Sequence, residues 1–302
     1  MRSVKPSVSL LVIAAIFAAW MTIAAIRLGS HTGPAAVNIA LLGLGISLGP
    51  CLAAYALAPL KRKQTARRLV LITGGATILV FSFLASANID LEGFFLLLFE
   101  GVAGAAIGHT MATLVLGPLF FGRFLCGWGC WRSMVLELLP VGRGAGRRSG
   151  IWRRGPPIGV AIAFAAAAAA YFVFGHHAGG APGSPHSAGT MALLVSAGAY
   201  YAASIGLACV LDDQRAFCKY LCPSAAVLRI TSRASMLAMR GDRGRCNGCG
   251  ACTKVCPMDI DVQAYAAAGR RIAGGECILC QRCANVCPRD ALAAEFRLPR
   301  GA

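Results

Sequence analysis

Charged residues are scarce in this 302-residue chain: only 14% of its residues are Asp, Glu, Lys or Arg, while 57% are hydrophobic. Soluble domains carry roughly 25% charged residues, so this composition, with a mean hydropathy of +0.65, excludes a purely soluble enzyme. Acidic residues are especially few, with 12 against 29 basic ones and a net charge of +17. The basic residues flank hydrophobic runs and form no aromatic-interleaved surface, so we expect no nucleic-acid partner.

Motifs for nucleotide and haem binding are also missing. The sequence Gly43-Leu-Gly45 lies inside a hydrophobic run rather than at a strand-to-helix turn, so neither a nicotinamide cofactor nor ATP is indicated. The chain contains no C-x-x-C-H sequence for covalent haem attachment. His109 is the one histidine well inside a predicted span, which argues against a haem with two histidine ligands.

Long apolar runs are abundant instead, and each is close to the roughly 20 residues that cross a bilayer as a helix. They predict a mainly α-helical, polytopic membrane bundle of about six spans, at residues 8–26, 37–58, 69–87, 94–121, 158–174 and 191–211. A signal peptide is the alternative for the first run, which follows Arg2 and Lys5. That run is longer than the roughly 7 to 15 residues typical of a signal peptide, so we favour a membrane anchor.

Lys and Arg residues beside the predicted spans indicate the orientation, because cytoplasmic loops retain them. Two loops are rich in them: Lys61, Arg62, Lys63, Arg67 and Arg68 follow the second span, and Arg123, Arg132, Arg143, Arg147, Arg148, Arg153 and Arg154 follow the fourth. The three alternate loops contain only Arg27. We therefore expect a multi-pass protein of the bacterial inner membrane with both termini in the cytoplasm.

Eight of the 14 cysteines fall into two copies of the pattern C-x2-C-x2-C-x3-C-P near the C-terminus. A [4Fe-4S] cluster needs four converging thiolates; three come from one short loop, while the fourth, before the proline, ligates the other cluster. The spacing thus predicts one cluster at Cys246, Cys249, Cys252 and Cys287 and a second at Cys277, Cys280, Cys283 and Cys256. Zinc is the rival, but it leaves the extra cysteine and proline of each motif unexplained. Disulfides are disfavoured in a reducing cytoplasm.

Two further cysteine pairs, Cys126 with Cys130 and Cys218 with Cys222, follow the fourth and sixth predicted spans. The i, i+4 spacing places the members of each pair on one face of a helix. Our hypothesis is that the pairs converge near the cytoplasmic surface and bind a redox metal or a third cluster, or cycle between dithiol and disulfide. The alternative is that each cysteine is a small apolar residue in a helix contact, which is the interpretation we favour for Cys51 and Cys209.

These motifs together give the chain a family resemblance. The two cluster motifs, the segment from Gly122 to Cys130 and the segment Cys218-Lys-Tyr-Leu-Cys222-Pro223 resemble membrane-bound polyferredoxins of the NapH and NosR type over residues 121–297. Trp131 stands where that family has proline, and the first two spans are extra compared with four-helix NapH proteins. The resemblance implies quinol oxidation coupled to electron transfer through partner redox subunits, which would be cytochromes or iron-sulfur proteins.

Glu100 and His109 are the ionisable residues of the fourth predicted span, and such residues in a membrane prompt a functional hypothesis. They are candidates for contact with a quinone headgroup. Nine residues place them about 180° apart on a straight helix, so Gly101, Gly104 or Gly108 would have to supply a kink. In the alternative interpretation, His109 makes an interhelical hydrogen bond and Glu100 lies near the outer surface.

We therefore predict three regions: a transmembrane domain at residues 1–211, a cytoplasmic connector at 212–240, and a small α+β ferredoxin domain with two [4Fe-4S] clusters at 241–302. The resemblance implies that such a protein relays single electrons between the quinone pool, or a cytoplasmic donor, and a partner oxidoreductase. The clusters would carry the electrons, so no catalytic side chain is proposed. A membrane copper reductase or maturation factor for another metalloenzyme is the alternative, and a structural anchor is a third.

Overall fold

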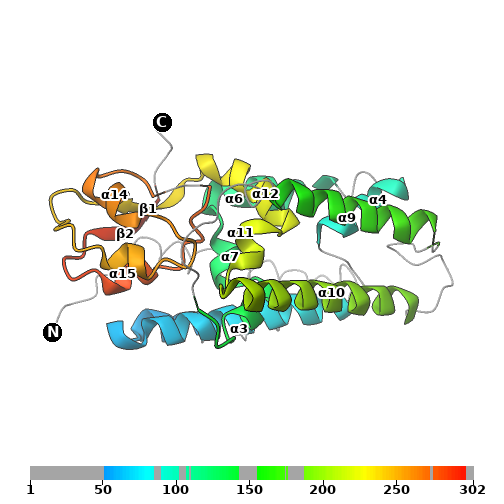
Figure 1. Cartoon of the computed structure of the whole chain (residues 1–302), viewed down its shortest axis with the longest axis horizontal. Coiled ribbons are helices and arrows are strands. Elements are labelled where there is room, and N and C mark those ends of the chain that lie inside the picture. Colours follow the sequence, from blue (N-terminus) through cyan, green and yellow to red (C-terminus); the bar gives the residue numbers. More distant parts are fainter. Residues whose placement is uncertain are drawn as a thin grey trace, which may run out of the picture.

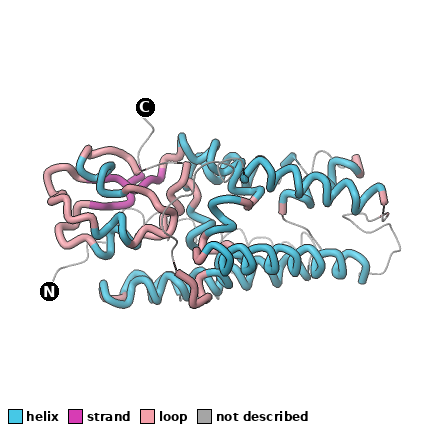
Figure 2. The backbone as a smooth tube through the Cα atoms, in the orientation of Figure 1, coloured by secondary structure: helices cyan, strands magenta, loops and turns pink. Residues whose placement is uncertain are grey.

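The computed structural model describes residues 51–84, 90–101, 107–108, 110–142, 155–173, 175, 187–272 and 275–296. These form an elongated molecule with long helices in one part and a small strand-containing part at one end (Figures 1 and 2). The elements of the helical part are η1 (Leu60–Arg62), α3 (Lys63–Leu84), α4 (Leu91–Phe99), the π-helix η2 (Met111–Leu116), α6 (Gly117–Phe121), α7 (Phe124–Trp128), α8 (Trp131–Leu136), α9 (Gly155–Phe172), α10 (Ser187–Leu211), α11 (Ala216–Tyr220), α12 (Pro223–Thr231) and η4 (Ser232–Ala234).

Two described helices are long and apolar enough to cross a membrane. They are α9, Gly155–Phe172, and the segment Leu194–Leu211 of α10. A third span is added if Met111–Phe121 and Phe124–Leu136, which bend by 86° at their junction, are counted as one broken span. Gly122 supplies the bend with a φ of +59°, a conformation that costs glycine little. The chain is thus a membrane protein by the length and composition of its helices, and residues 8–26, with most of 37–58, lie outside the described part.

The fourth predicted span, residues 94–121, is not one continuous helix. Helix α4 is followed by Glu100 and by Gly101, whose φ of +76° is incompatible with a right-handed helix. The stretch from Met111 then continues as η2 and α6. Hydropathy averaged over a window of sequence does not detect this interruption, because the glycine and the glutamate at the break are surrounded by apolar residues.

The C-terminal part is built on a two-stranded antiparallel sheet. Strands β1 (Leu237–Gly241) and β2 (Leu292–Phe296) pair with Leu237 opposite Phe296. The helices between them are α13 (Ala251–Lys254), α14 (Val262–Ala267) and α15 (Arg282–Val286). Asp261 caps α14 by accepting a hydrogen bond from the Ala264 N–H. β1 begins at Leu237, before the domain boundary expected at residue 241, because the first strand of this domain pairs with its last strand.

The two parts share a core. Leu237, Met239 and Ile278 are buried in the C-terminal part, and Phe121 and Phe124 of the helical part pack against them. The expected connector, residues 212–240, contains α11, α12 and η4, and α11 is fully buried. Figure 1 shows α7 and α11 between the strand-containing end and the long helices α9 and α10. These two short helices carry the first cysteine of each C-x3-C pair, Cys126 and Cys218, so both pairs begin where the two parts meet.

Candidate redox site

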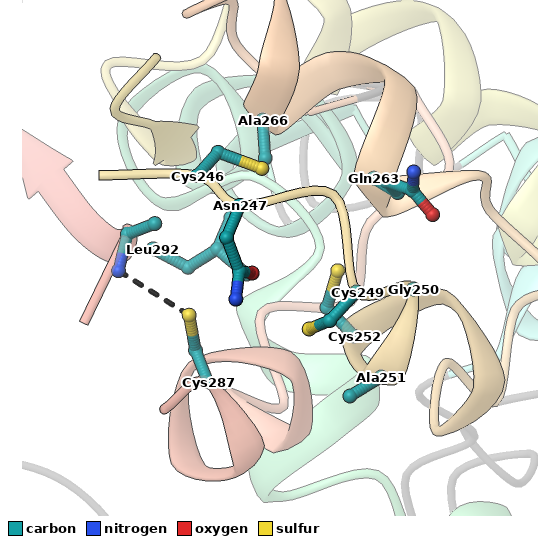
Figure 3. Close-up of a pocket in the computed structure, with 11 residues that line it drawn as sticks. Cys246, Asn247, Cys249, Gly250, Ala251, Cys252, Gln263, Ala266, Cys287 and Leu292 are labelled. Carbon is teal, nitrogen blue, oxygen red and sulfur yellow. Dashed lines mark hydrogen bonds between the residues drawn. The ribbon is translucent and has the colours of Figure 1, made fainter. Parts of the chain in front are cut away.

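Two hollows in the C-terminal part are each lined by four cysteines. The first is lined by Cys246, Cys249, Cys252 and Cys287 (Figure 3). The second is lined by Cys256, Cys277, Cys280 and Cys283. Three cysteines of one motif thus meet the last cysteine of the other motif in each hollow. The structure brings together the two sets of four that the spacing predicts.

The two cysteine loops share an unusual backbone. Gly248 and Gly250 in the first loop have φ values of +74° and +73°, and Leu279 and Gln281 occupy the same places in the second with +56° and +57°. Residues in this left-handed conformation turn backbone N–H groups into anion-binding nests. The Leu279 N–H donates to the Cys277 sulfur. The loops therefore stabilise thiolates, although the left-handed conformation costs each non-glycine residue about 1–2 kcal/mol.

The surroundings of these thiols fit a metal cluster. Burial raises the pKa of Cys277 to about 12 and also raises the pKa of Cys252 and Cys256, so these thiols ionise only when a metal replaces the proton. Among the described residues that line the hollows, Arg282 carries the one charged side chain and there is no carboxylate. A ligand set of thiolates alone is typical of zinc and of iron-sulfur clusters. Here each set of four cysteines takes three from one motif and one from the other, and backbone N–H groups donate to sulfur. Both features fit [4Fe-4S] clusters.

The second cysteine loop is docked on the helical part. The Trp128 Nε1 donates to the Leu279 carbonyl oxygen at 2.9 Å, and the Tyr55 hydroxyl donates to the Gln281 Oε1 at 2.8 Å. Gly127 lies so close that a Cβ atom built on it would be 2.3 Å from the Ile278 carbonyl oxygen. Only glycine permits this approach of the two backbones. The loop that lines the second hollow is therefore in direct contact with the first C-x3-C segment.

Glu137 forms a buried ionic centre at the same junction. Its carboxylate bonds three guanidinium groups, those of Arg67 in α3, Arg215 before α11 and Arg282 in α15; the Arg215 contact is 2.8 Å. These arginines lower the pKa of Glu137 to about 2, overcoming the opposite effect of burial. One carboxylate thus joins two parts of the helical region and the C-terminal domain. Sequence analysis missed it, although Glu137 is the sole acidic residue between Glu100 and Asp212.

The two C-x3-C segments have the same local structure. Cys126 lies in α7 and Cys218 in α11, while Cys130 and Cys222 are the N-cap residues of α8 and α12 with extended backbones. In both segments the second cysteine N–H bonds the carbonyl oxygen five residues earlier. Trp131 replaces the proline of the second segment without changing this turn, because the N–H at the first helical position needs no helical partner.

These four thiols lie near enough to one another to interact electrostatically. The Cys222 thiol is raised to a pKa of about 12, mainly by burial, and the charges of Cys218, Cys130 and Cys126 contribute. Arg132 Nη1 lies 3.7 Å from the Cys222 sulfur. We call Cys126, Cys130, Cys218 and Cys222 the thiol quartet. In the described part of the chain, no group of three or more His, Cys, Asp or Glu residues is arranged to hold a single metal ion, which applies to the quartet and to both hollows alike.

Glycines on two long helices hold the quartet in place. A Cβ on Gly75 of α3 would be 3.2 Å from the Cys130 carbonyl oxygen. On α9, a Cβ on Gly155 or Gly159 would be 1.8 Å or 1.9 Å from the carbonyl oxygens of Tyr220 and Leu221. Both C-x3-C turns are thus packed directly on the backbones of long helices, which leaves them little freedom to move.

The remaining candidate residues lie elsewhere. Glu100 is the half-buried C-cap of α4, and His109 lies outside the described residues, so quinone contact by this pair stays a prediction. The Cys51 sulfur is 3.4 Å from the Thr73 hydroxyl, and Cys209 is exposed on α10. Neither is among the quartet or the cysteines that line the hollows.

The fold and the site define an iron-sulfur protein with a C-terminal 4Fe-4S ferredoxin domain. Residues 245–292 match a family model described as a 4Fe-4S dicluster domain. An uncharacterized protein of Methanocaldococcus jannaschii is 39% identical over 46 residues, which are 15% of this chain and 19% of that protein. The chain therefore spans about a fifth of the length of this curated relative. No solved structure matches this chain.

Proposed function

We propose that this protein is a membrane-bound relay that passes single electrons between the quinone pool, or a cytoplasmic donor, and a partner oxidoreductase. The observation that carries the proposal is the docking of the second cysteine loop on the helical part, through Trp128 and Gly127. A ferredoxin domain that served only a soluble partner has no need of this contact. Here a loop of cluster ligands is built into the junction with the membrane part.

Eight cysteines would hold two clusters: Cys246, Cys249, Cys252 and Cys287 at the first hollow, and Cys256, Cys277, Cys280 and Cys283 at the second. Bound [4Fe-4S] clusters supply one-electron redox chemistry. The chain provides the thiolates, donates backbone N–H groups to sulfur, and buries the second loop. The Ala291 N–H, for example, donates to the Cys287 sulfur at 3.3 Å. Burial and N–H donors are the means by which a protein sets a cluster potential.

The two cysteine loops differ in access, which supports a direction through the molecule. Cys252 of the first loop is as buried as Cys280 and Cys283 of the second, each 8% exposed, but Cys249 of the first loop is exposed and no cysteine of the second loop is. We propose that a soluble redox partner docks at the first loop and that the second loop communicates with the membrane part. The partner would be a cytochrome or another iron-sulfur protein.

The placement in the membrane is part of the proposal. Six spans with both termini in the cytoplasm of a bacterium would put the ferredoxin domain on the reducing side, where cysteine thiols do not form disulfides. Lys61 and Arg62, which precede α3, support this orientation, because basic residues beside a span are retained in the cytoplasm. The NapH and NosR type of polyferredoxin is the finer class that we propose.

A copper reductase or maturation factor is the second candidate, because soft thiolate ligands of the kind found in the quartet prefer Cu(I). One experiment separates the two functions. Anaerobically prepared membranes containing the full-length protein are mixed with quinol or with Cu(II), and cluster reduction and copper reduction are each followed by EPR. Quinol-dependent reduction of the clusters supports the relay. Copper reduction without any quinol-dependent cluster signal would contradict it and favour the alternative.

A further inference from the structure

We infer that the thiol quartet holds a third redox centre, a thiolate-bound iron or copper centre of net negative charge, in electronic contact with the second hollow. This inference rests on the proposed electron-transfer function. It assigns a cofactor to residues 126–222, which lie outside the segment that matches the dicluster family model. Four thiols carry it, two in the short helices α7 and α11 and two at the N-caps of α8 and α12, together with three buried guanidinium groups near them.

The cysteine pairs are part of a longer duplicated motif. Arg123 precedes Cys126 by three residues, and Arg215 precedes Cys218 by three residues, so both segments read R-x-x-C-x-x-x-C. Both arginines are N-cap residues, of α7 and α11 respectively. An arginine that recurs at the same place beside a thiol pair serves the pair, since two unrelated helix ends have no reason to share it.

Arg123 is a buried cation with unused hydrogen-bonding capacity. Its side chain is 0% exposed; Nη1 donates to the Gly275 carbonyl oxygen at 3.4 Å and lies 3.6 Å from the Glu276 carboxylate, while Nε and Nη2 have no hydrogen-bond partner. Arg123 also interacts electrostatically with the thiols of Cys126, Cys218 and Cys222. Two unpaired N–H groups on a buried guanidinium are costly unless a further anionic group faces them. Metal-bound thiolates at the quartet would be that group.

Arg132 and Arg215 complete the positive surroundings. Arg132 Nη1 reaches the Cys222 sulfur at 3.7 Å, and its Nε atom is buried without a hydrogen-bond partner. Arg215 Nη1 donates to the Cys126 carbonyl oxygen at 3.2 Å. Although both arginines also pair with carboxylates, Glu137 is shared among three guanidinium groups, so positive charge remains in excess at the junction. Neutral thiols do not compensate this charge, whereas a thiolate centre does.

The quartet also lies where an electron could continue from the second hollow. Cys126 packs against the core that contains Cys280 and Cys283. Arg215, which bonds the Cys126 carbonyl, also experiences the charge of Cys280. Cys256, Cys277, Cys280 and Cys283 would hold the donor and the quartet cysteines the acceptor of a single electron, so that a one-unit oxidation at the first would balance a one-unit reduction at the second. No bond is made or broken, and no proton is transferred.

The test measures metals in the full-length protein, purified anaerobically in detergent. Iron, copper and zinc per chain are determined for the wild type, for the double variant C126S/C222S, and for the matched control C51S/C209S, which removes the two cysteines outside the site. We expect the wild type and the control to contain iron or copper beyond the amount in two [4Fe-4S] clusters. The double variant loses this excess and its EPR signal but keeps the ferredoxin signals.

Excess iron identifies an iron centre and excess copper a copper centre. A wild-type protein with no excess metal, with zinc alone, or with a quartet disulfide would overturn the inference, as would an unchanged metal content in the double variant. The wild-type measurement stands even if the variant fails to fold. Failure of the proposed function is distinguishable, because it shows as absent or quinol-insensitive ferredoxin signals in the wild type, whatever the excess metal.

Discussion

The two cysteine loops have the same spacing and the same left-handed backbone positions, yet their surroundings are opposite. The first uses Gly248 and Gly250 at those positions, and its Cys249 is exposed. The second uses Leu279 and Gln281, and both residues bond the helical part, through Trp128 and Tyr55. The two loops therefore share their cysteine spacing and left-handed backbone positions, while the residues between the cysteines determine what each loop contacts.

This contrast shows how two sites with the same ligands can give electron transfer a direction, because their surroundings differ. The loop built with glycines leaves one sulfur ligand, Cys249, exposed to a partner. The loop built with larger residues accepts about 1–2 kcal/mol of conformational cost for each, and gains contacts with the membrane part. If the docked loop is the exit toward the membrane, changes at the junction should affect electron transfer more than matched changes at the exposed loop.

The largest effect is expected from Glu137→Gln. This change leaves the buried guanidinium groups of Arg67, Arg215 and Arg282 without their shared carboxylate, and loss of one buried partner costs about 3–5 kcal/mol. The midpoint of thermal unfolding, measured anaerobically in detergent at a fixed scan rate, should fall strongly. Glu276→Gln is the comparison: this carboxylate is 26% exposed and lies 3.6 Å from one buried guanidinium, that of Arg123, so its loss should cost less than the loss of a carboxylate shared by three. Equal effects would show that the Glu137 centre does not hold the two parts together.

Acid should act on the same centre. The pKa of Glu137 is about 2 in the folded protein against an ordinary value of 4.5, so the folded state binds this proton less readily than the unfolded state. Its contribution to stability is therefore fully present above about pH 4.5 and is lost as the pH falls toward 2. The difference in unfolding midpoint between wild type and Glu137→Gln should shrink across this range. A difference that is constant with pH would contradict the ionic role.

An intermediate effect is expected at the point of closest approach between the two parts. In Gly127→Ala the new methyl would meet the Ile278 carbonyl oxygen at 2.3 Å, so the docked loop must move away; overpacking of this kind costs about 1–3 kcal/mol. We expect full cluster content but slower electron exchange between the ferredoxin domain and the membrane part, measured by rapid-mixing EPR with quinol.

Gly248→Ala is the matched change in the exposed loop. Its φ of +74° imposes about 1–2 kcal/mol of strain on alanine, but the new methyl meets only the Gln263 side chain, at 3.7 Å. The two variants should thus be similar in stability and different in electron exchange. If Gly248→Ala slows exchange with the membrane part as much as Gly127→Ala does, the docked loop has no special place in the route.

Much of the ferredoxin site was predictable because cluster ligation depends on short-range spacing. The two C-x2-C-x2-C-x3-C-P motifs predicted which four cysteines would share each hollow, and Cys287 and Cys256 lie with the opposite motif. For each motif, most of the distances are set by a few residues of backbone, so the surrounding fold has little influence. The i, i+4 spacing, in contrast, predicted that Cys126 and Cys130 share one helical face, and this prediction is wrong: Cys126 lies in α7, whereas Cys130 is the N-cap of α8 with an extended backbone.

The junction was not predictable, because it depends on contacts between residues far apart in the chain. Arg67 was assigned to membrane topology, yet it is 0% exposed and bonds Glu137. Arg123 and Arg132 were also counted as loop charges, and both are buried beside the quartet. The break after α4 was missed for another reason: hydropathy averages over a window and does not register the left-handed backbone at Gly101.

The smallest expected effect tests whether the side chain of Gln281 is used for docking. Tyr55→Phe removes the 2.8 Å hydrogen bond to Gln281 and should cost about 0.5–1.5 kcal/mol. Gln281→Gly removes the same bond but also relieves the strain of a φ of +57°, so its net change in unfolding free energy should be close to zero. In the double variant, Tyr55→Phe should cost almost nothing further. A double-mutant cycle measures this coupling. Additive effects would mean that Gln281 keeps its strained conformation for a reason other than its contact with Tyr55.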